Sequence, residues 1–371
     1  MLEFCIKMAV GLLRFVNLFF RPFKQKERVV VISRQSDEPT LDIQLLCQEF
    51  EKNDVDYVVL TKTLKSSFLG ALSYSMHLMC QMYYLATSKV VIVDGYCILV
   101  SILPKRNGQF VVQMWHALGA IKKFGWQSAE NPDGHGRQFS EIMQMHRNYD
   151  YVVAPGEITG RYFAEGFRTA ESKVVYYGLP RIDFILNRDE ANFNEITTRY
   201  PQVKEKKIVL YVPTFRKNAA LEMEKFVSFF DFERFHLVIK KHFLDKGDYS
   251  WAEQTGAIVD TAFSSLEWLR ICDKVVTDYS AMAFEAAIAE KELYIFQPDE
   301  KDYAHNVGLN VDLQKEAISE YVCNSEKTLF SKFKEPYEMR KLHAFRDKYF
   351  EIELNHCTAA LCNFIKTLLK N

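Results

Sequence analysis

The chain has 371 residues, of which 48% are hydrophobic and 26% charged, a composition that is typical of a folded globular protein and excludes disordered, collagenous and coiled-coil chains. The 47 basic and 48 acidic residues give a net charge of −1, so the chain lacks the basic excess of a general nucleic-acid-binding protein. Its length predicts two domains. None of the eight cysteines has zinc-ligand spacing, which predicts buried, reduced thiols in a cytoplasmic protein.

Residues 1–25 have the pattern of an amphipathic helix. Five residues recur at helical spacing and form one polar stripe, while apolar and aromatic residues occupy the other faces: Glu3, Lys7, Arg14, Asn17 and Arg21. Residues 1–28 carry a net charge of +4, against −5 for the rest of the chain. This pattern favours an interfacial helix on an anionic membrane surface. The alternative is a helix packed against its own protein.

A second unusual segment, residues 66–88, contains no charged residue. Its length would suffice to span a bilayer, but its serine, histidine, glutamine and threonine side chains make it too polar for a typical membrane-spanning helix. We therefore expect a buried or partly lipid-facing helix within the first domain.

Short, nearly continuous apolar runs rich in β-branched residues recur along the chain and alternate with helical patterns. This alternation predicts an α/β fold with parallel, doubly wound sheets that are covered on both faces. The polar stretch 187–207 indicates a connector, so we expect a first Rossmann-like domain over 26–190 and a second over 207–371, facing a cleft. The expected strands are 28–32, 55–60, 90–93, 110–114, 151–153, 174–177, 208–212, 236–239, 257–259, 274–277 and 293–296.

In the first domain, two candidate site residues follow strands, as ligand-binding residues do in such sheets. His116 comes just after the strand 110–114 and is suited to accept a proton, and the loop that follows, together with an expected helix start, would offer backbone donors to an anion. The alternative is a core histidine beside Trp115. Arg181 follows the strand 174–177 and suits a bidentate phosphate contact, the alternative being a structural pair with Asp183.

The second domain has three such segments. Pro213, Thr214 and Arg216 form a polar loop after its first strand. Lys240, Lys241 and His242 form a cationic cluster that would neutralise a diphosphate, or else a solvated strand end. Ser280 is expected to be the N-cap of a helix over 281–290, whose free N–H groups would bind a phosphate. A P-loop and a strand-initiated G-x-G-x-x-G are both absent.

Taken together, the segments WHALGAIKKFG, GLPRID, YVPTFR, KKH and TDYSAMAFE, in this order over about residues 110–305, resemble the CDP-glycerol glycerophosphotransferase family of teichoic-acid primases and polymerases. The resemblance implies a GT-B fold, with an acceptor-side first domain and a second domain that binds the CDP-alcohol. It also implies peripheral attachment to the cytoplasmic face of the cell membrane, which agrees with the N-terminal helix.

The resemblance also implies roles for individual residues. His116 matches the proposed catalytic base, which would take the proton of an acceptor hydroxyl as the hydroxyl attacks the β-phosphorus and CMP leaves. His242 would be the second catalytic residue, so that two imidazoles from opposite domains meet at the diphosphate. The residues that match donor-binding positions are Ala117, Leu118, Gly119, Ala120, Arg181, Pro213, Thr214, Lys240, Ser280, Ala281 and Glu285.

The implied substrates are CDP-glycerol or CDP-ribitol and an acceptor saccharide linked to undecaprenyl diphosphate. Many family members have Gly-Thr-Pro after the motif histidine, where this chain has Ala117, Leu118 and Gly119, and this departure leaves the transferred alcohol open. Two other functions stay open: a GT-B glycosyltransferase that uses a nucleotide sugar, and a membrane-bound scaffold without activity. No metal or other cofactor is expected, because Asp54 and Asp56 form a D-x-D at a strand start, where a turn is the simpler reading.

Overall fold

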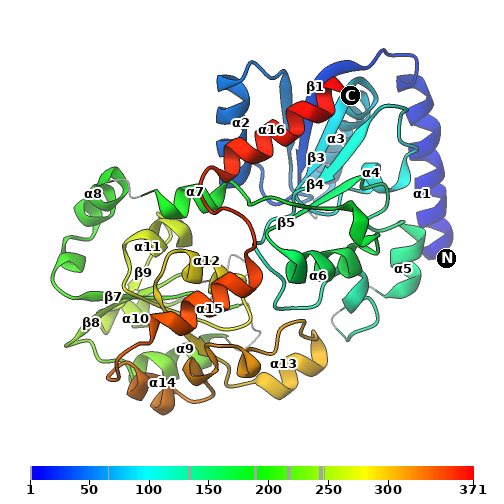
Figure 1. Cartoon of the computed structure of the whole chain (residues 1–371). Coiled ribbons are helices and arrows are strands. Elements are labelled where there is room, and N and C mark those ends of the chain that lie inside the picture. The colour runs from blue at the N-terminus through cyan, green and yellow to red at the C-terminus, as the bar shows by residue number, and fades with distance from the viewer. Residues whose placement is uncertain are drawn as a thin grey trace. The chain divides into compact units, whose positions relative to one another are not determined.

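The computed structural model describes residues 2–65, 67–132, 134, 136–187, 190–214, 219–241, 245 and 247–371. The chain divides into two compact units (Figure 1). Unit 1 comprises Met1–Asp183 together with Phe350–Asn371, and unit 2 comprises Phe184–Tyr349.

Unit 1 is built on a six-stranded parallel sheet with the strand order β2-β1-β3-β4-β5-β6. Most of β1 and β3 is completely buried, as the continuous Val and Ile runs predict for central parallel strands covered on both faces. The strands are β1 (Lys26–Ser33), β2 (Tyr57–Thr61), β3 (Ser88–Val93), β4 (Phe110–Gln113), β5 (Tyr151–Ala154) and β6 (Val174–Tyr176).

Helices cover both faces of this sheet (Figure 1). They are α1 (Leu2–Asn17), α2 (Leu41–Lys52), α3 (Phe68–Thr87), α4 (Ile98–Ile102), α5 (Arg137–Ile142), α6 (Glu157–Phe167) and α16 (Cys357–Lys370), with 3₁₀ turns η1 (Leu18–Phe20), η2 (Gly125–Ser128) and η3 (Glu171–Lys173). The boundary with unit 2 falls within α7 (Arg181–Leu186).

The C-terminal helix corrects the expected domain boundary, because residues 350–371 belong to unit 1 and not to the second domain. α16 packs beside α2 and against β1 and β3 (Figure 1). Its apolar face, which includes Leu361, Ile365 and Leu368, is buried there. Asp183 caps the helix by accepting hydrogen bonds from the backbone N–H groups of Cys357 and Thr358, at 2.9 and 2.8 Å.

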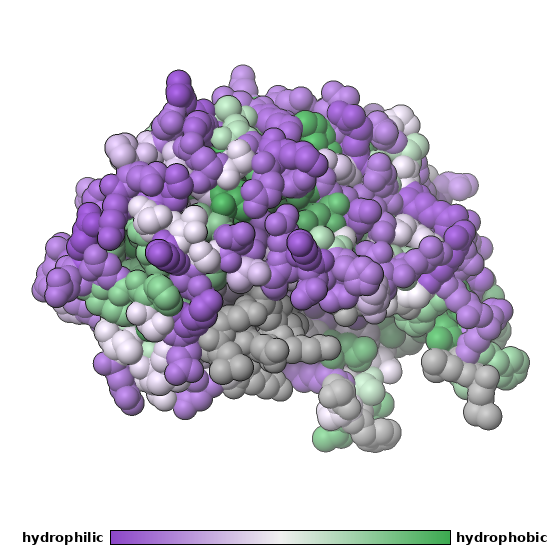
Figure 2. Space-filling view, turned by 90° about the horizontal axis from the view of Figure 1, so that it is seen from below, coloured by the Kyte–Doolittle hydropathy of each residue, from purple (hydrophilic) through white to green (hydrophobic). Residues whose placement is uncertain are grey.

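The N-terminal helix α1 has two apolar faces with different environments. Ile6, Val10, Leu13 and Val16 pack on the hydrophobic core of unit 1, so one face bears out the alternative of a helix packed on its own protein. A second stripe is exposed to between 59% and 67%, and Figure 2 shows hydrophobic side chains at the edge of the molecule where this helix lies. The stripe consists of Phe4, Met8, Leu12, Phe15 and Phe19.

The segment without charged residues that was expected to be helical forms α3. One face of this helix is partly exposed. Leu69, Leu72, Met76 and Met79 recur at helical spacing and are exposed, while Met82 and Leu85 are buried in the core. Within the described parts of the chain, no helix is both long and apolar enough to cross a membrane. All eight cysteines are free thiols, and Cys5 and Cys80 are exposed rather than buried.

Unit 2 repeats the architecture with a second six-stranded parallel sheet, in the order β12-β11-β10-β7-β8-β9. Its strands are β7 (Lys207–Tyr211), β8 (Phe235–Ile239), β9 (Ile258–Val259), β10 (Lys274–Thr277), β11 (Glu292–Phe296) and β12 (Val322–Cys323). Its helices are α8 (Glu190–Arg199), α9 (Ala219–Ser228), α10 (Ser250–Gln254), α11 (Ser265–Ile271), α12 (Met282–Ile288), α13 (Glu300–Asn306), α14 (Glu326–Lys332) and α15 (Met339–Tyr349), with 3₁₀ turns η4 (Pro201–Lys204), η5 (Leu313–Lys315) and η6 (Ser319–Tyr321).

The eleven strands expected from the sequence are all present as β1 to β11. β12 was not expected, because two residues are too short a run to show a strand pattern.

Candidate functional site

The candidate site in unit 1 lies at the edge of the sheet where the parallel strands end. Ser33 is the last residue of β1, Asp94 follows β3, and His116 follows β4 after a short loop. Because β1, β3 and β4 are neighbours in the sheet, their carboxyl ends bring these three side chains together.

His116 is held by its Nδ1 atom, which lies 2.7 Å from the backbone carbonyl oxygen of Asp94. A carbonyl oxygen only accepts hydrogen bonds, so Nδ1 carries the proton in this contact and Nε2 keeps a lone pair. The carboxamide nitrogen of Gln35 lies 3.1 Å from the same Nδ1 atom, but an amide N–H group only donates, so this contact is not a hydrogen bond when Nδ1 carries the proton. The imidazole is therefore oriented as a base that acts through Nε2.

Burial lowers the pKa of His116 to about 4, and the positive charge of Arg181 acts in the same direction. The hydrogen bond to the Asp94 carbonyl opposes this shift without cancelling it. The imidazole is thus neutral across the physiological pH range, which is the form a general base requires.

The residue before His116 has a strained backbone. Trp115 has a φ of +62°, a left-handed conformation that is costly for a residue with a bulky side chain. Its backbone N–H donates to Gln113 Oε1 at 2.9 Å, and its ring stacks on Phe124 and lies 4.0 Å from the His116 ring, centroid to centroid. These contacts hold the turn that presents His116, and such strain is characteristic of functional sites.

Asp94 is a buried carboxyl group beside the histidine. Its Oδ2 atom accepts a 2.7 Å hydrogen bond from Ser33 Oγ, whereas its buried Oδ1 atom has no partner among the residues that the structure describes. Burial raises the pKa of Asp94 to about 6, although the Ser33 hydrogen bond acts in the opposite direction. Asp94, Gln35 and Arg34 line a cavity of about 180 Å³ at this edge of the sheet.

Arg181 has a different partner from the one that the sequence suggested. Its Nε atom donates to Asp42 Oδ2 at 2.8 Å, and its backbone N–H donates to Asp42 Oδ1 at 2.8 Å. Asp42 is buried in the first turn of α2, whereas Asp183 caps α16 and is not the pair of Arg181. The charges of Asp42 and Arg181 both influence the pKa of His116, so the pair lies within electrostatic reach of the imidazole.

The loop after His116 does not lead into a helix, which corrects the expected helix start. Residues 117–120 are irregular, and the next element is the 3₁₀ turn η2. Leu118, Gly119 and Ala120 are buried, yet within the described chain no hydrogen bond is made by the backbone N–H groups from Ala117 to Ala120. Buried N–H groups without a partner are costly, and an anionic ligand would satisfy them.

In unit 2, Asp278 joins the two loops that contain Thr214 and Tyr279. Its carboxylate accepts hydrogen bonds from the Thr214 backbone N–H and Oγ1, the latter at 2.9 Å, and from the Tyr279 backbone N–H at 2.7 Å. Thr214 and Asp278 are both buried. Thr214 therefore helps to join the ends of β7 and β10, and Pro213, which precedes it, is half-buried.

Lys240 is engaged in a structural network. Its Nζ atom donates to the backbone oxygen and Oδ2 of Asp260, at 2.7 and 2.9 Å, and to the Phe263 carbonyl oxygen. Burial alone would raise the pKa of Asp260, but hydrogen bonds from Lys240, Trp268 and the backbone lower it to about 2. A contact between Lys240 and a donor phosphate would have to replace one of these bonds. Lys241 donates to the Gly247 carbonyl oxygen at 3.1 Å and lies over the Tyr249 ring.

The N-cap of α12 lies one residue later than the sequence predicted. The N-cap of α12 is Ala281, and Ser280 precedes it, with its Oγ atom accepting a 3.3 Å hydrogen bond from the Met282 backbone N–H. Ser280 and Ala281 are half-buried, and Glu285 is buried within α12.

His242 and Arg216 lie outside the described residues. The meeting of His116 with His242 therefore stays a prediction. Among the residues that are described, no group of three or more histidine, cysteine or acidic side chains is arranged to hold a metal ion.

Residues 14–367 match the family described as CDP-glycerol:poly(glycerophosphate) glycerophosphotransferase. The chain belongs to this family. It is therefore a phosphotransferase, and the donor that the family implies is a CDP-alcohol.

Relatives of this glycerophosphotransferase act in teichoic-acid synthesis. It is 27% identical to the teichoic acid ribitol-phosphate primase of Bacillus spizizenii, over 75% of each chain. It is 26% identical to the teichoic acid glycerol-phosphate primase of Bacillus subtilis, over 79% of this chain and 77% of the relative. Its structure is similar to that of the wall teichoic acid polymerase TagF, with a TM-score of 0.77, 16% identity, and coverage of 99% of this chain and 98% of the other. The fold is therefore the GT-B fold that the motifs implied.

Several residues of the site were missed by reasoning from the sequence. Ser33, Gln35, Asp42 and Asp94 were not proposed, although Ser33 and Asp94 end or follow strands that were expected. The position of a polar residue directly after an apolar run was the signal available for Asp94. Nothing local marks Asp42, because its partner Arg181 is 139 residues away along the chain.

The raised pKa of Asp94 predicts a pH dependence of stability. An acid that binds its proton more tightly in the folded state stabilises the protein fully below its unfolded pKa, and this contribution is lost as the pH rises through about 6. We expect the wild-type protein to lose about 1–1.5 kcal/mol from this group between pH 5 and pH 7.5, and Asp94→Asn to lack that loss. Urea unfolding at both pH values measures the difference.

The matched control for Asp94 is Glu27→Gln, which changes an exposed carboxylate near the start of β1. This control is expected to keep the pH dependence of the wild type. Equal pH dependence in Asp94→Asn and the wild type would contradict the interpretation of Asp94.

Proposed function

We propose that the chain transfers glycerol phosphate or ribitol phosphate from a CDP-alcohol to a lipid-linked acceptor in teichoic-acid synthesis and releases CMP. The observation that carries this proposal is the orientation of His116, whose protonated Nδ1 is held by the Asp94 carbonyl so that Nε2 is available as a base. The family membership and the motifs around His116 and Ser280 support the choice of a CDP-alcohol as the donor.

In the proposed reaction, an acceptor hydroxyl oxygen forms a bond to the β-phosphorus of the CDP-alcohol. The bond from this phosphorus to the oxygen that bridges it to the α-phosphate breaks, and CMP leaves with the electron pair. The hydroxyl proton passes to Nε2 of His116, which is neutral before the reaction because its pKa is near 4. A positioned base of this kind typically contributes about 10²–10⁴ in rate.

Two sets of hydrogen-bond donors are proposed to stabilise the negative charge of the diphosphate. The unpaired backbone N–H groups of residues 117–120 support a role in holding the donor from unit 1. In unit 2, the loops that Asp278 joins, with Thr214 and Ser280, are proposed to contact the CDP-alcohol, together with Arg216 and His242. Fixed donors of this type stabilise the charge that develops on the leaving group.

The proposed activity is tested by measuring nucleotide release. The full chain is incubated with a lipid-linked saccharide acceptor and, separately, with CDP-glycerol, CDP-ribitol and UDP-sugars. We expect CMP from one or both CDP-alcohols and an acceptor whose mass increases by one alcohol phosphate. Release of UDP with transfer of a sugar would instead identify a glycosyltransferase, and donor binding without any transfer would identify an inactive scaffold.

The same assay tests the role of His116. We expect His116→Ala to reduce CMP release by about 10²–10⁴, because the general base is lost. The control is His236→Gln, which removes a half-buried imidazole near the amino end of β8, away from the carboxyl edge of its sheet. Near-wild-type turnover in folded His116→Ala would remove this residue from the mechanism.

We also propose that the protein attaches peripherally to the cytoplasmic face of the membrane, where an undecaprenyl-diphosphate-linked acceptor would be located. The exposed stripe of α1, which is rich in phenylalanine, and the exposed stripe of α3 support this attachment. The net charge of +4 over residues 1–28 favours an anionic lipid surface.

Membrane attachment predicts that the double variant Phe4→Ser, Phe19→Ser binds vesicles of anionic lipid more weakly. Both rings are about two-thirds exposed, so their removal should leave the fold intact. We expect the partition coefficient in a sedimentation assay to fall by about tenfold or more, since each apolar side chain buried in lipid contributes about 1.5–3 kcal/mol at most. Phe193→Ser, Phe229→Ser, which changes two exposed rings of unit 2, is the control, and an equal effect there would contradict the role of α1.

A further inference from the structure

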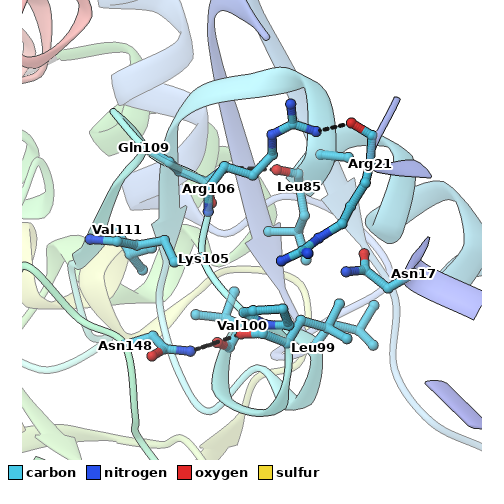
Figure 3. Close-up of a pocket in the computed structure, with 13 residues that line it drawn as sticks. Asn17, Arg21, Leu85, Leu99, Val100, Lys105, Arg106, Gln109, Val111 and Asn148 are labelled. Atoms are coloured by element: carbon cyan, nitrogen blue, oxygen red, sulfur yellow. Dashed lines mark hydrogen bonds between the residues drawn. The ribbon is translucent and has the colours of Figure 1, made fainter. Parts of the chain in front are cut away.

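A pocket of unit 1 lies at the end of α1, away from the residues assigned to the transfer reaction. It consists of an inner hollow of about 30 Å³ beside the loop 103–109 and an outer hollow of about 530 Å³, and the two share Arg21, Leu103, Pro104 and Asn148. In Figure 3 the side chain of Arg21 extends into the inner hollow, between Arg106 and Val100 and beside the carboxamide of Asn17.

The pocket has a strong positive charge, and no acidic residue lines either hollow. The guanidinium of Arg21 has no hydrogen-bond or ion-pair partner in the described part of the chain. Lys105 pairs with Asp150, and the other basic side chains bond to neutral groups. Like charges that gather without counter-charges repel each other, and an anion would relieve this repulsion. The basic residues are Arg14, Arg21, Lys105, Arg106 and Arg147.

An uncharged polar side chain of the inner hollow also favours an anionic ligand. Asn17 is only 7% exposed and lines the inner hollow, yet its carboxamide makes no hydrogen bond within the described residues. The carboxamide atoms still reach the surface of the hollow, so a ligand oxygen that enters it would accept the amide N–H group. The uncharged donor and the unpaired guanidinium together suit a phosphate oxygen.

The backbone beside the pocket is strained. Gln144 and Asn148, which line it, and His146, which lies between them in the chain, all have positive φ values, between +47° and +75°. The Asn148 side chain secures this segment by donating to the carbonyl oxygens of Val100 and Leu103, at 2.8 and 3.0 Å. Three left-handed residues within five positions persist only where the surroundings impose them, as at ligand sites.

The apolar part of the pocket indicates where the anion comes from. Phe15 and Leu18 line the outer hollow and are 59% and 51% exposed, and Phe15 belongs to the exposed stripe of α1. A ligand with its phosphate where the two hollows meet, beside Arg21, would therefore carry its apolar chain along the surface that is proposed to enter the membrane. A soluble phosphate would leave this apolar wall uncovered.

We propose that this pocket binds the phosphate group of a membrane lipid, with Arg21 and Asn17 contacting the phosphate and Phe15 and Leu18 contacting the lipid chain. The proposal rests on the membrane attachment proposed above, but not on the transfer reaction.

The test is calorimetric titration of the full chain with three probes below their aggregation concentrations: dihexanoyl phosphatidylglycerol, farnesyl diphosphate and glycerol 3-phosphate. The variant is Arg21→Gln, Arg147→Gln, which removes two exposed charges without an acidic partner. We expect saturable binding of an amphiphilic probe and a loss of about 10–100-fold in the variant, the range for one charge-assisted hydrogen bond. The control is Lys24→Gln, Lys26→Gln, which changes the charge equally at two exposed residues outside the pocket.

Tighter binding of the phospholipid identifies a bulk lipid head group, and tighter binding of farnesyl diphosphate identifies the carrier lipid of the acceptor; both support the proposal. Equal losses in the variant and the control, equal affinity for glycerol 3-phosphate, or no saturable binding would overturn it. The titration contains no CDP-alcohol, so its result does not depend on the proposed transfer. A separate assay of CMP release from the same preparations, with a CDP-alcohol and acceptor added, tests the transfer itself.

Discussion

The hydrogen bond between His116 Nδ1 and the Asp94 carbonyl oxygen is the contact on which the candidate site depends. It joins the segments that follow β3 and β4, two neighbouring strands, and it determines which nitrogen of the imidazole accepts a proton. The left-handed backbone of Trp115 and the aromatic packing around its ring place the histidine where this bond forms. A rigid sheet edge thus positions a base whose neutral form is maintained by burial.

Buried carboxylates organise the loops of both units. Asp42 holds Arg181, Asp278 joins the loops after β7 and β10, and Asp260 gathers Lys240 with donors from the segment that follows it. Each carboxylate accepts several hydrogen bonds, which offsets the cost of burying its charge. The loops at the ends of the strands are therefore ordered by charge-assisted contacts as well as by apolar packing.

The N-terminal helix packs on its own protein, which is one of the two alternatives that the sequence presented, and it also keeps a second apolar face exposed. One apolar face packs on the core of unit 1, and the other remains exposed beside a cationic pocket. Attachment of the helix to the protein makes the exposed stripe a fixed surface instead of a mobile arm. In the membrane attachment proposed above, this arrangement would hold the carboxyl edge of the sheet at a constant distance from the lipid surface.

The sequence by itself determined the strands, the α/β class and the position of His116 after a strand, because continuous apolar runs and the residues that end them are local features of a chain. Only the tertiary structure decided which distant groups meet: Asp42 with Arg181, Gln35 with His116, and α16 with the first sheet although it ends the chain. These pairings depend on how strands are ordered in space and on which helix faces remain to be buried. A linear pattern carries no information on either, since residues that share a contact here are separated by 81 or 139 positions.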